Sequence, residues 1–220
     1  MSRPLLITDC DEVLLHMVVP FRQWLEEAHD VDFSFAHHDF AGALTRRGDG
    51  GTLETAEVWA LLRGFFQTEM HRQHPIEGAL PTLMGLADMA DIVVLTNISE
   101  EDHGRRVDQL RAQGVPFPVH WNQGGKGSRV RRLIDEYQPS TVLFVDDLAP
   151  HHASVARHTP QVWRLHMVGE PEMARHVDPS PDAHARIDSW AEAEQWIRAR
   201  LSGDPAPITA DDGLHSRSCG

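Results

Sequence analysis

Short apolar runs alternate with amphipathic segments over most of this chain. Five runs of four or five mostly apolar residues are too short for typical helices and predict buried strands. These runs lie at 5–8, 92–95, 118–121, 141–145 and 161–165. Apolar residues recur at helical spacing at about 79–89, 99–113, 128–137, 150–158 and 188–201. This alternation is typical of βαβ units and predicts an α/β core with a mainly parallel sheet.

The segment between the first two runs has a different pattern. Helices are expected at 20–30 and from about 52 to 70, the second with Thr52 as its N-cap. The stretch between them, 31–51, is polar and irregular. We therefore expect a small helical insertion after the first strand. The expected parts are a core at 1–15 and 76–202, the insertion at 16–75 and a disordered tail at 203–220.

Charge and composition disfavour several kinds of partner and location for this protein. The 220 residues carry a formal net charge of −13, which disfavours nucleic acid as a partner because proteins that bind it present basic surfaces. The two cysteines, Cys10 and Cys219, lie far apart, so no disulfide framework is expected and a reducing cytoplasm is the expected location. No signal peptide is recognisable, and no apolar run approaches the ~18 residues of a membrane span, so no membrane partner is expected.

Polar side chains with chemical capability follow three of the expected strands. They are Asp9 and Asp11 after the first, Thr96 and Asn97 after the second, and Asp146 and Asp147 after the run at 141–145. In open parallel sheets the ligand crevice lies beyond the carboxyl ends of the strands. These three groups are therefore expected to converge on one site.

Asp9 and Asp11 stand one residue apart, so on an extended strand their side chains point to the same face and Cys10 points to the other. Burying both carboxylates without a partner would cost several kcal/mol. A divalent cation with oxygen ligands, such as Mg²⁺, would compensate them. The alternative is that they cap the helix that follows.

Lys126 is the only lysine in the sequence and stands in a glycine-rich loop, 122–127, just before an expected helix. Helix N-termini favour anions, so a phosphate group could bind there. An ordinary surface lysine is the alternative, although its position between glycines is hard to ascribe to solubility.

In their order along the chain, these residues resemble the motifs of the haloacid dehalogenase-like hydrolase superfamily. The first motif is matched by Asp9-Cys10-Asp11-Glu12-Val13, with Glu12 where a glycine is often found. The remaining three are matched by Thr96, Lys126 and the pair Asp146-Asp147. The resemblance spans about residues 5–165 and implies a Rossmann-like three-layer core with a helical cap inserted after the first strand.

The resemblance also implies a reaction and a role for each residue. Asp9 would be the nucleophile that takes up a phosphoryl group, and Asp11 the general acid and then base. Thr96, Asn97 and Lys126 would bind the phosphorylated substrate. The expected cofactor is Mg²⁺, held by Asp9, Asp11 through its backbone carbonyl, Asp146 and, directly or through water, Asp147. An acid at position 11 favours a phosphatase or phosphotransferase over a dehalogenase, because a halide leaves without a proton.

Several alternatives stay open. A phosphotransferase or phosphomutase differs only in what accepts the phosphoryl group. A phosphoacceptor signalling domain also gathers acids, a threonine and a lysine, but its lysine comes last, whereas Lys126 precedes Asp146. A non-catalytic binding module is disfavoured because no motif residue is missing. Arg46 and Arg47 could contact a second anionic group of a small phosphomonoester or belong to a solvated loop.

Overall fold

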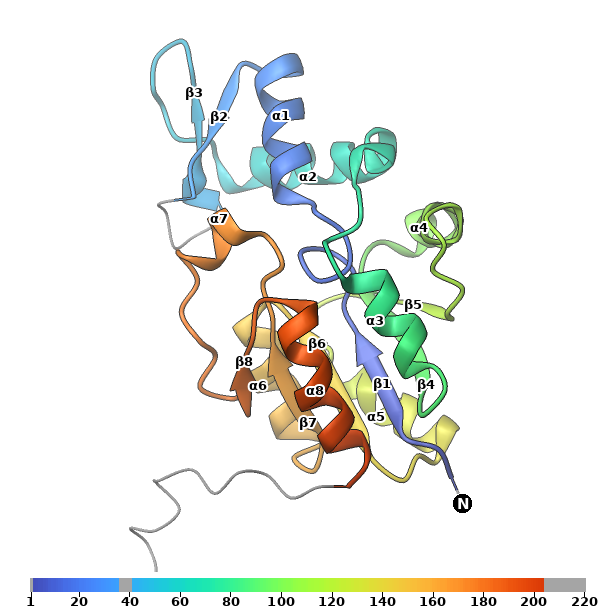
Figure 1. The fold of residues 1–220 in the computed structure, drawn as a ribbon. Helices are drawn as coiled ribbons and strands as arrows, with labels where there is room; N and C mark the ends of the chain where they lie inside the picture. Colours follow the sequence, from blue (N-terminus) through green and yellow to red (C-terminus); the bar gives the residue numbers. More distant parts are fainter. Residues whose placement is uncertain (1, 36–40, 204–220) are drawn as a thin grey trace, which may run out of the picture.

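The computed structural model describes residues 2–35 and 41–203, and most of the expected tail lies outside them. Six parallel strands form one sheet in the order β5-β4-β1-β6-β7-β8. The strands are β1 (Leu5–Thr8), β4 (Asp91–Asn97), β5 (Val119–Asn122), β6 (Val142–Asp146), β7 (Trp163–His166) and β8 (Ala185–Arg186). The α/β, Rossmann-like fold class is confirmed, and the first strand lies in the middle of the sheet (Figure 1).

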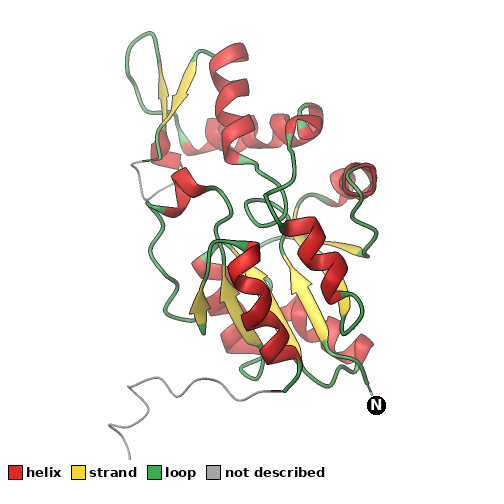
Figure 2. Ribbon diagram, viewed as in Figure 1, coloured by secondary structure: helices red, strands yellow, loops and turns green. Residues whose placement is uncertain are grey.

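Helices cover both faces of this sheet (Figure 2). They are α3 (Ala79–Leu86), α4 (Glu100–Ala112), α5 (Gly127–Tyr137), α6 (Ala149–His158) and α8 (Trp190–Leu201), with a short α7 (Pro171–Ala174) after β7. Successive residues of a strand face opposite sides. Leu6 accordingly packs with α3, α4 and α8 in one apolar core, whereas Leu5 and Ile7 pack with α5 and α6 in a second. These are the three layers of the expected core.

Residues 18–35 and 41–72 form a separate lobe beyond the carboxyl ends of the strands, here called the inserted lobe (Figure 1). It contains α1 (Val18–Ala28), β2 (Val31–Phe33), the short turns η1 (Ala41–Ala43) and η2 (Met70–Arg72), β3 (Leu44–Arg46) and α2 (Thr55–Thr68). Its own apolar core includes Phe21, Leu44 and Phe65, all fully buried. The lobe therefore folds around side chains that the sheet does not cover.

The expectation of an irregular stretch at 31–51 was wrong in part. Val31 pairs with Arg46 and Phe33 with Leu44 in an antiparallel hairpin. Each strand has only three residues, too few to show an alternating pattern in the sequence. The hairpin is stabilised because Val31 and Leu44 bury their side chains against α1 and α2.

Helix ends were predicted with mixed success. Ser99, the first residue of the helix expected at 99–113, caps α4, and its hydroxyl accepts a hydrogen bond from the backbone N–H of Asp102. Thr52 is not the N-cap of α2; Glu54 takes that place, in a reciprocal capping box with Glu57. Within residues 2–35 and 41–203, no helix combines the length and apolarity needed to cross a bilayer.

Two chain segments join the inserted lobe to the sheet, and they lie side by side. The backbone N–H of His16 donates to the carbonyl of His74 at 3.0 Å, and Leu15 forms a bridge with Pro75. The first segment follows β1 and the second leads from η2 to α3, and their pairing holds the lobe beyond the end of the central strand (Figure 1). This places it next to the polar residues that follow β1.

Candidate active site

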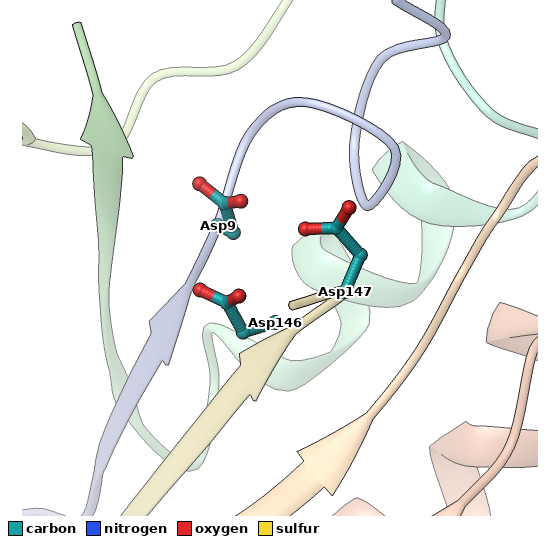
Figure 3. A group of neighbouring side chains, drawn as sticks. All are labelled: Asp9, Asp146 and Asp147. Carbon is teal, nitrogen blue, oxygen red and sulfur yellow. The ribbon is translucent and has the colours of Figure 1, made fainter. Parts of the chain in front are cut away.

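Strand register brings Asp9 level with Asp146. Thr8 is opposite Val145 in the pairing of β1 with β6, so the next residues of the two strands lie side by side. Asp147 follows directly, and one carboxylate oxygen from each of these three aspartates lies within 4.8 Å of the others (Figure 3). The expected convergence of the first and fourth motifs is therefore observed.

Lys126 reaches this cluster from the N-terminus of α5. Its ammonium group lies 2.7 Å from a carboxylate oxygen of Asp9 and 2.6 Å from one of Asp146. Its side chain is completely buried, and so is that of Asp146. Gly127 permits this approach: a Cβ there would overlap the carbonyl oxygen of Ser154 in α6, so only glycine lets α5 begin so close to α6.

Burial and like charge raise the pKa values of two of the acids. For Asp9, the loss of hydration on burial raises the pKa, although Lys126 opposes the rise. For Asp147, burial and then the neighbouring carboxylates of Asp146 and Asp9 raise the pKa well above its usual range. Burial alone would lower the pKa of Lys126, but Asp146 and Asp9 outweigh it, so the pKa is raised and the side chain is a cation.

The charges in this cluster do not balance. With all three carboxylates ionised, a single ammonium group would leave about two negative charges uncompensated in a buried site, which is why burial and like charge raise the pKa values of Asp9 and Asp147. Among the described residues, none donates a hydrogen bond to the carboxylate of Asp147. Oxygen ligands with this residual charge suit a divalent cation such as Mg²⁺.

The Asp11 side chain does not join this cluster. Arg106 of α4 contacts both its carboxylate oxygens, at 2.9 and 3.0 Å, and the side-chain amide of Gln73 donates to it at 2.7 Å. The expected cation between the Asp9 and Asp11 carboxylates is therefore replaced, on the Asp11 side, by a guanidinium group. Cys10 packs in the apolar core, as expected, but its sulfur also lies 3.2 Å from the Arg106 guanidinium group that binds Asp11, so the expectation that it faces away from Asp11 was wrong. Burial raises the pKa of its thiol, so it stays protonated.

Thr96 and Asn97 occupy the edge of the same site. The hydroxyl of Thr96 is buried and lies 3.4 Å from the Asp11 carboxylate. The side-chain amide of Asn97 donates to the carbonyl of Gly124, in the loop that leads to Lys126, and lies 3.3 Å from a ring nitrogen of His151. All seven residues expected at the site thus lie at the carboxyl ends of β1, β4 and β6 or at the start of α5.

Two histidines to which the sequence analysis gave no role at this site contact the backbone of the aspartates. His152 lies 3.0 Å from the backbone carbonyl of Asp146, and His166 lies 2.7 Å from that of Asp147. The second ring nitrogen of His166 accepts a hydrogen bond from the backbone of Ser180, so its neutral ring donates to Asp147. Burial lowers the pKa of each to about 4, which keeps both rings neutral.

Glu12 stands where the similar motif often has a glycine. Its φ is +57°, in the left-handed region that favours glycine, which is a physical reason for a glycine at this position. Its carboxylate accepts hydrogen bonds from the backbone N–H groups of Met17 and Val18 at the start of α1. Burial raises the pKa of Glu12 to about 7, and these two hydrogen bonds oppose the rise. Glu12 therefore links the end of β1 to the inserted lobe.

Comparison with known proteins identifies the fold. No protein-family model matches the sequence, and no curated protein matches it significantly. YfnB of Bacillus subtilis, a proposed HAD hydrolase solved with magnesium, aligns with a TM-score of 0.61 at 14% identity, covering 90% of this chain and 99% of that one. A phosphatase of Haemophilus somnus, predicted to act on phosphoglycolate, aligns with a TM-score of 0.58 at 16% identity (88% and 97% covered). A proposed β-phosphoglucomutase of Thermotoga maritima aligns with a TM-score of 0.56 at 12% identity, covering 89% of this chain and 98% of that one.

These structures cover nearly the whole chain and almost all of their own length. Their low sequence identity limits the comparison to the fold. The chain therefore has the fold of the haloacid dehalogenase-like hydrolases, as the order of its motifs indicated.

Proposed function

We propose that this protein is an enzyme that hydrolyses a small phosphomonoester with Mg²⁺ as cofactor. The observation that carries the proposal is the buried cluster of Asp9, Asp146 and Asp147 with Lys126 bound between the first two. Phosphoryl transfer depends mainly on alignment and on the neutralisation of spread negative charge. A cation and one lysine at the end of a central strand supply both, and the magnesium-bound relative YfnB supports the choice of metal.

In this proposal each residue acts from the place it occupies in the structure. Asp9, at the end of β1, attacks the phosphorus atom, so that the alcohol leaves and an aspartyl-phosphate forms; water then releases the phosphate. Lys126 and Thr96 bind the phosphoryl oxygens, and Asn97 borders them. Asp9, Asp146, Asp147 and the backbone carbonyl of Asp11 would hold the metal, which would offset the charge of the phosphoryl group.

Asp11 is proposed to protonate the leaving oxygen and later to take the proton from water. Arg106 and Gln73 hold its carboxylate in this structure. Proton donation therefore requires Asp11 to exchange part of this contact for the leaving oxygen. Gln73 stands in the segment that joins the inserted lobe to the sheet, so a small movement of that segment could release it. The inserted lobe is proposed to act as a cap over the site.

The test is hydrolysis of phenyl phosphate and a panel of phosphomonoesters, with Mg²⁺ and with a chelator. Asp9→Asn keeps the shape of the side chain and removes its charge, so turnover should fall by at least about 10³-fold. Asp108→Asn is the matched control, because that side chain is 79% exposed on α4, and it should keep wild-type turnover. A folded Asp9→Asn protein with wild-type turnover would contradict the mechanism.

A further inference from the structure

A cavity of about 280 Å³ opens over Asp9 and Asp147, and its walls are largely apolar. Trp59, Leu62 and Phe66 line it from α2 of the inserted lobe, and Leu148, the N-cap residue of α6, lines it from the core. The volume is at the lower end of the range for small-molecule pockets, about 300–1,000 Å³. The cavity therefore suits a small ligand with one end at the carboxylates and the other among apolar side chains.

Two of these side chains are unusually exposed. Trp59 is 54% exposed and Leu148 is 44% exposed; Met84, on α3, is the third large apolar side chain this exposed among the described residues. Exposed apolar groups gathered at one place mark binding sites more often than isolated ones do. Because Trp59 and Leu148 border the same cavity as the aspartates, this apolar surface is continuous with the proposed catalytic site.

Among the described residues, the lining of the cavity has no arginine or lysine for a second anionic group. The lining includes the acids Asp9, Asp11, Glu12 and Asp147. Arg106 lies nearby but is completely buried, with its guanidinium group on Asp11 and over the ring of Phe66. A carboxylate or second phosphate on the substrate would meet only like charge there.

The two arginines that the sequence suggested for a second anion do not line this cavity. Arg46 contacts Glu57 at 2.6 Å, and Arg47 contacts Asp32 at 2.6 Å, so each already has an acidic partner within the inserted lobe. Arg46 lines a different cavity, on the far side of α2, together with Asp49 and Glu57. The alternative, that they belong to a solvated loop, fits their exposure.

We propose that the leaving group of the substrate is an uncharged aromatic alcohol whose ring packs between Trp59 and Leu148. This inference rests on the proposed function and adds the class of substrate. A ring stacked on Trp59 gains contact energy, whereas a leaving group that carries a carboxylate would be repelled by the acids of the cavity. The site is therefore selective for aryl phosphates over phosphate esters of hydroxy acids.

Binding of non-hydrolysable phosphonates tests this selectivity without turnover. Titration calorimetry with Mg²⁺ present compares phenylphosphonate, methylphosphonate and carboxymethylphosphonate on the wild type, Trp59→Ala and Met84→Ala. Phenylphosphonate should bind the wild type about tenfold more tightly than either other ligand, and Trp59→Ala should remove that advantage. Methylphosphonate binding should be the same in all three proteins. Met84→Ala is the matched control, 49% exposed and outside the cavity.

Equal or tighter binding of carboxymethylphosphonate would overturn the inference, as would undiminished binding of phenylphosphonate to Trp59→Ala or no binding by the wild type. Leu148→Ala, at the lining residue from the core, should also weaken the binding of phenylphosphonate and leave the binding of methylphosphonate unchanged. If phenylphosphonate binds as expected but phenyl phosphate is not hydrolysed, the proposed function fails and the ligand class stands.

Discussion

Replacing Arg106 by methionine removes the one cation that contacts the Asp11 carboxylate among the described residues. Arg106 is completely buried and the Asp11 side chain is 16% exposed, so little water can replace the lost partner. Breaking a buried ion pair from one side typically costs about 3–5 kcal/mol. Gln73 still donates to Asp11, so we expect the lower part of that range, about 3 kcal/mol. Domains of this kind unfold at about 5–15 kcal/mol, so the loss is large.

Urea unfolding, followed by circular dichroism at neutral pH, measures this cost. The wild type, Arg106→Met, Asp11→Asn and the double variant form a cycle that isolates the pair. Because most of the cost comes from the unpaired carboxylate, the double variant should be clearly more stable than the sum of the single losses predicts. The pair is buried, so the result should change little between about 0.1 M and about 1 M salt. A loss below about 1 kcal/mol in Arg106→Met, or strict additivity, would refute this reasoning.

Two further predictions concern the stability of the fold. Gly127→Ala should destabilise the protein by at least about 1–3 kcal/mol in thermal or urea unfolding, because its Cβ would overlap the backbone of Ser154. Gly104→Ala, in the open middle of α4, should instead stabilise it by about 0.5–1 kcal/mol; a similar effect of both would contradict the packing described. His184 accepts a hydrogen bond from the backbone of Arg164, and burial and then the Arg164 charge lower its pKa from 6.5 to about 4. The unfolded chain thus protonates His184 at a higher pH than the folded protein does, so the contribution of His184 to stability should fall as pH drops from 6.5 to 4, by less than about 1.4 kcal/mol per pH unit because the ring is partly exposed. His184→Asn should show a smaller fall over that range, and an unchanged fall would count against the shift.

The sheet could be predicted because its strands are buried on both faces and stand out as apolar runs. The runs at 92–95 and 141–145 correspond to β4 and β6 within two residues at each end. β8 has only two residues, and β2 and β3 have three each, so packing against neighbours rather than local pattern defines them. Their existence depends on contacts that a sequence does not display.

The site was predictable in its residues and only partly in its contacts. Parallel strands bring their carboxyl ends to one edge, which was enough to expect Asp9 near Asp146. The partner of Asp11 was missed because Arg106 lies about a hundred residues away on a largely polar helix. One signal was present in the spacing of α4. Asp102, Arg106 and Leu110 are spaced four apart, so two charged residues share the buried face of the helix with a leucine.

The central claim is that Asp9 itself takes up the phosphoryl group, and acid quenching during turnover tests it most directly. Phenyl phosphate labelled in its phosphoryl group is mixed with the Mg²⁺-loaded protein, quenched within a single turnover and digested. The account predicts a label on the peptide that contains Asp9, released by hydroxylamine, formed and lost at least as fast as turnover, and absent from Asp9→Asn. Turnover of phenyl phosphate with no label on the chain, or with the label on a peptide that lacks Asp9, would contradict the account.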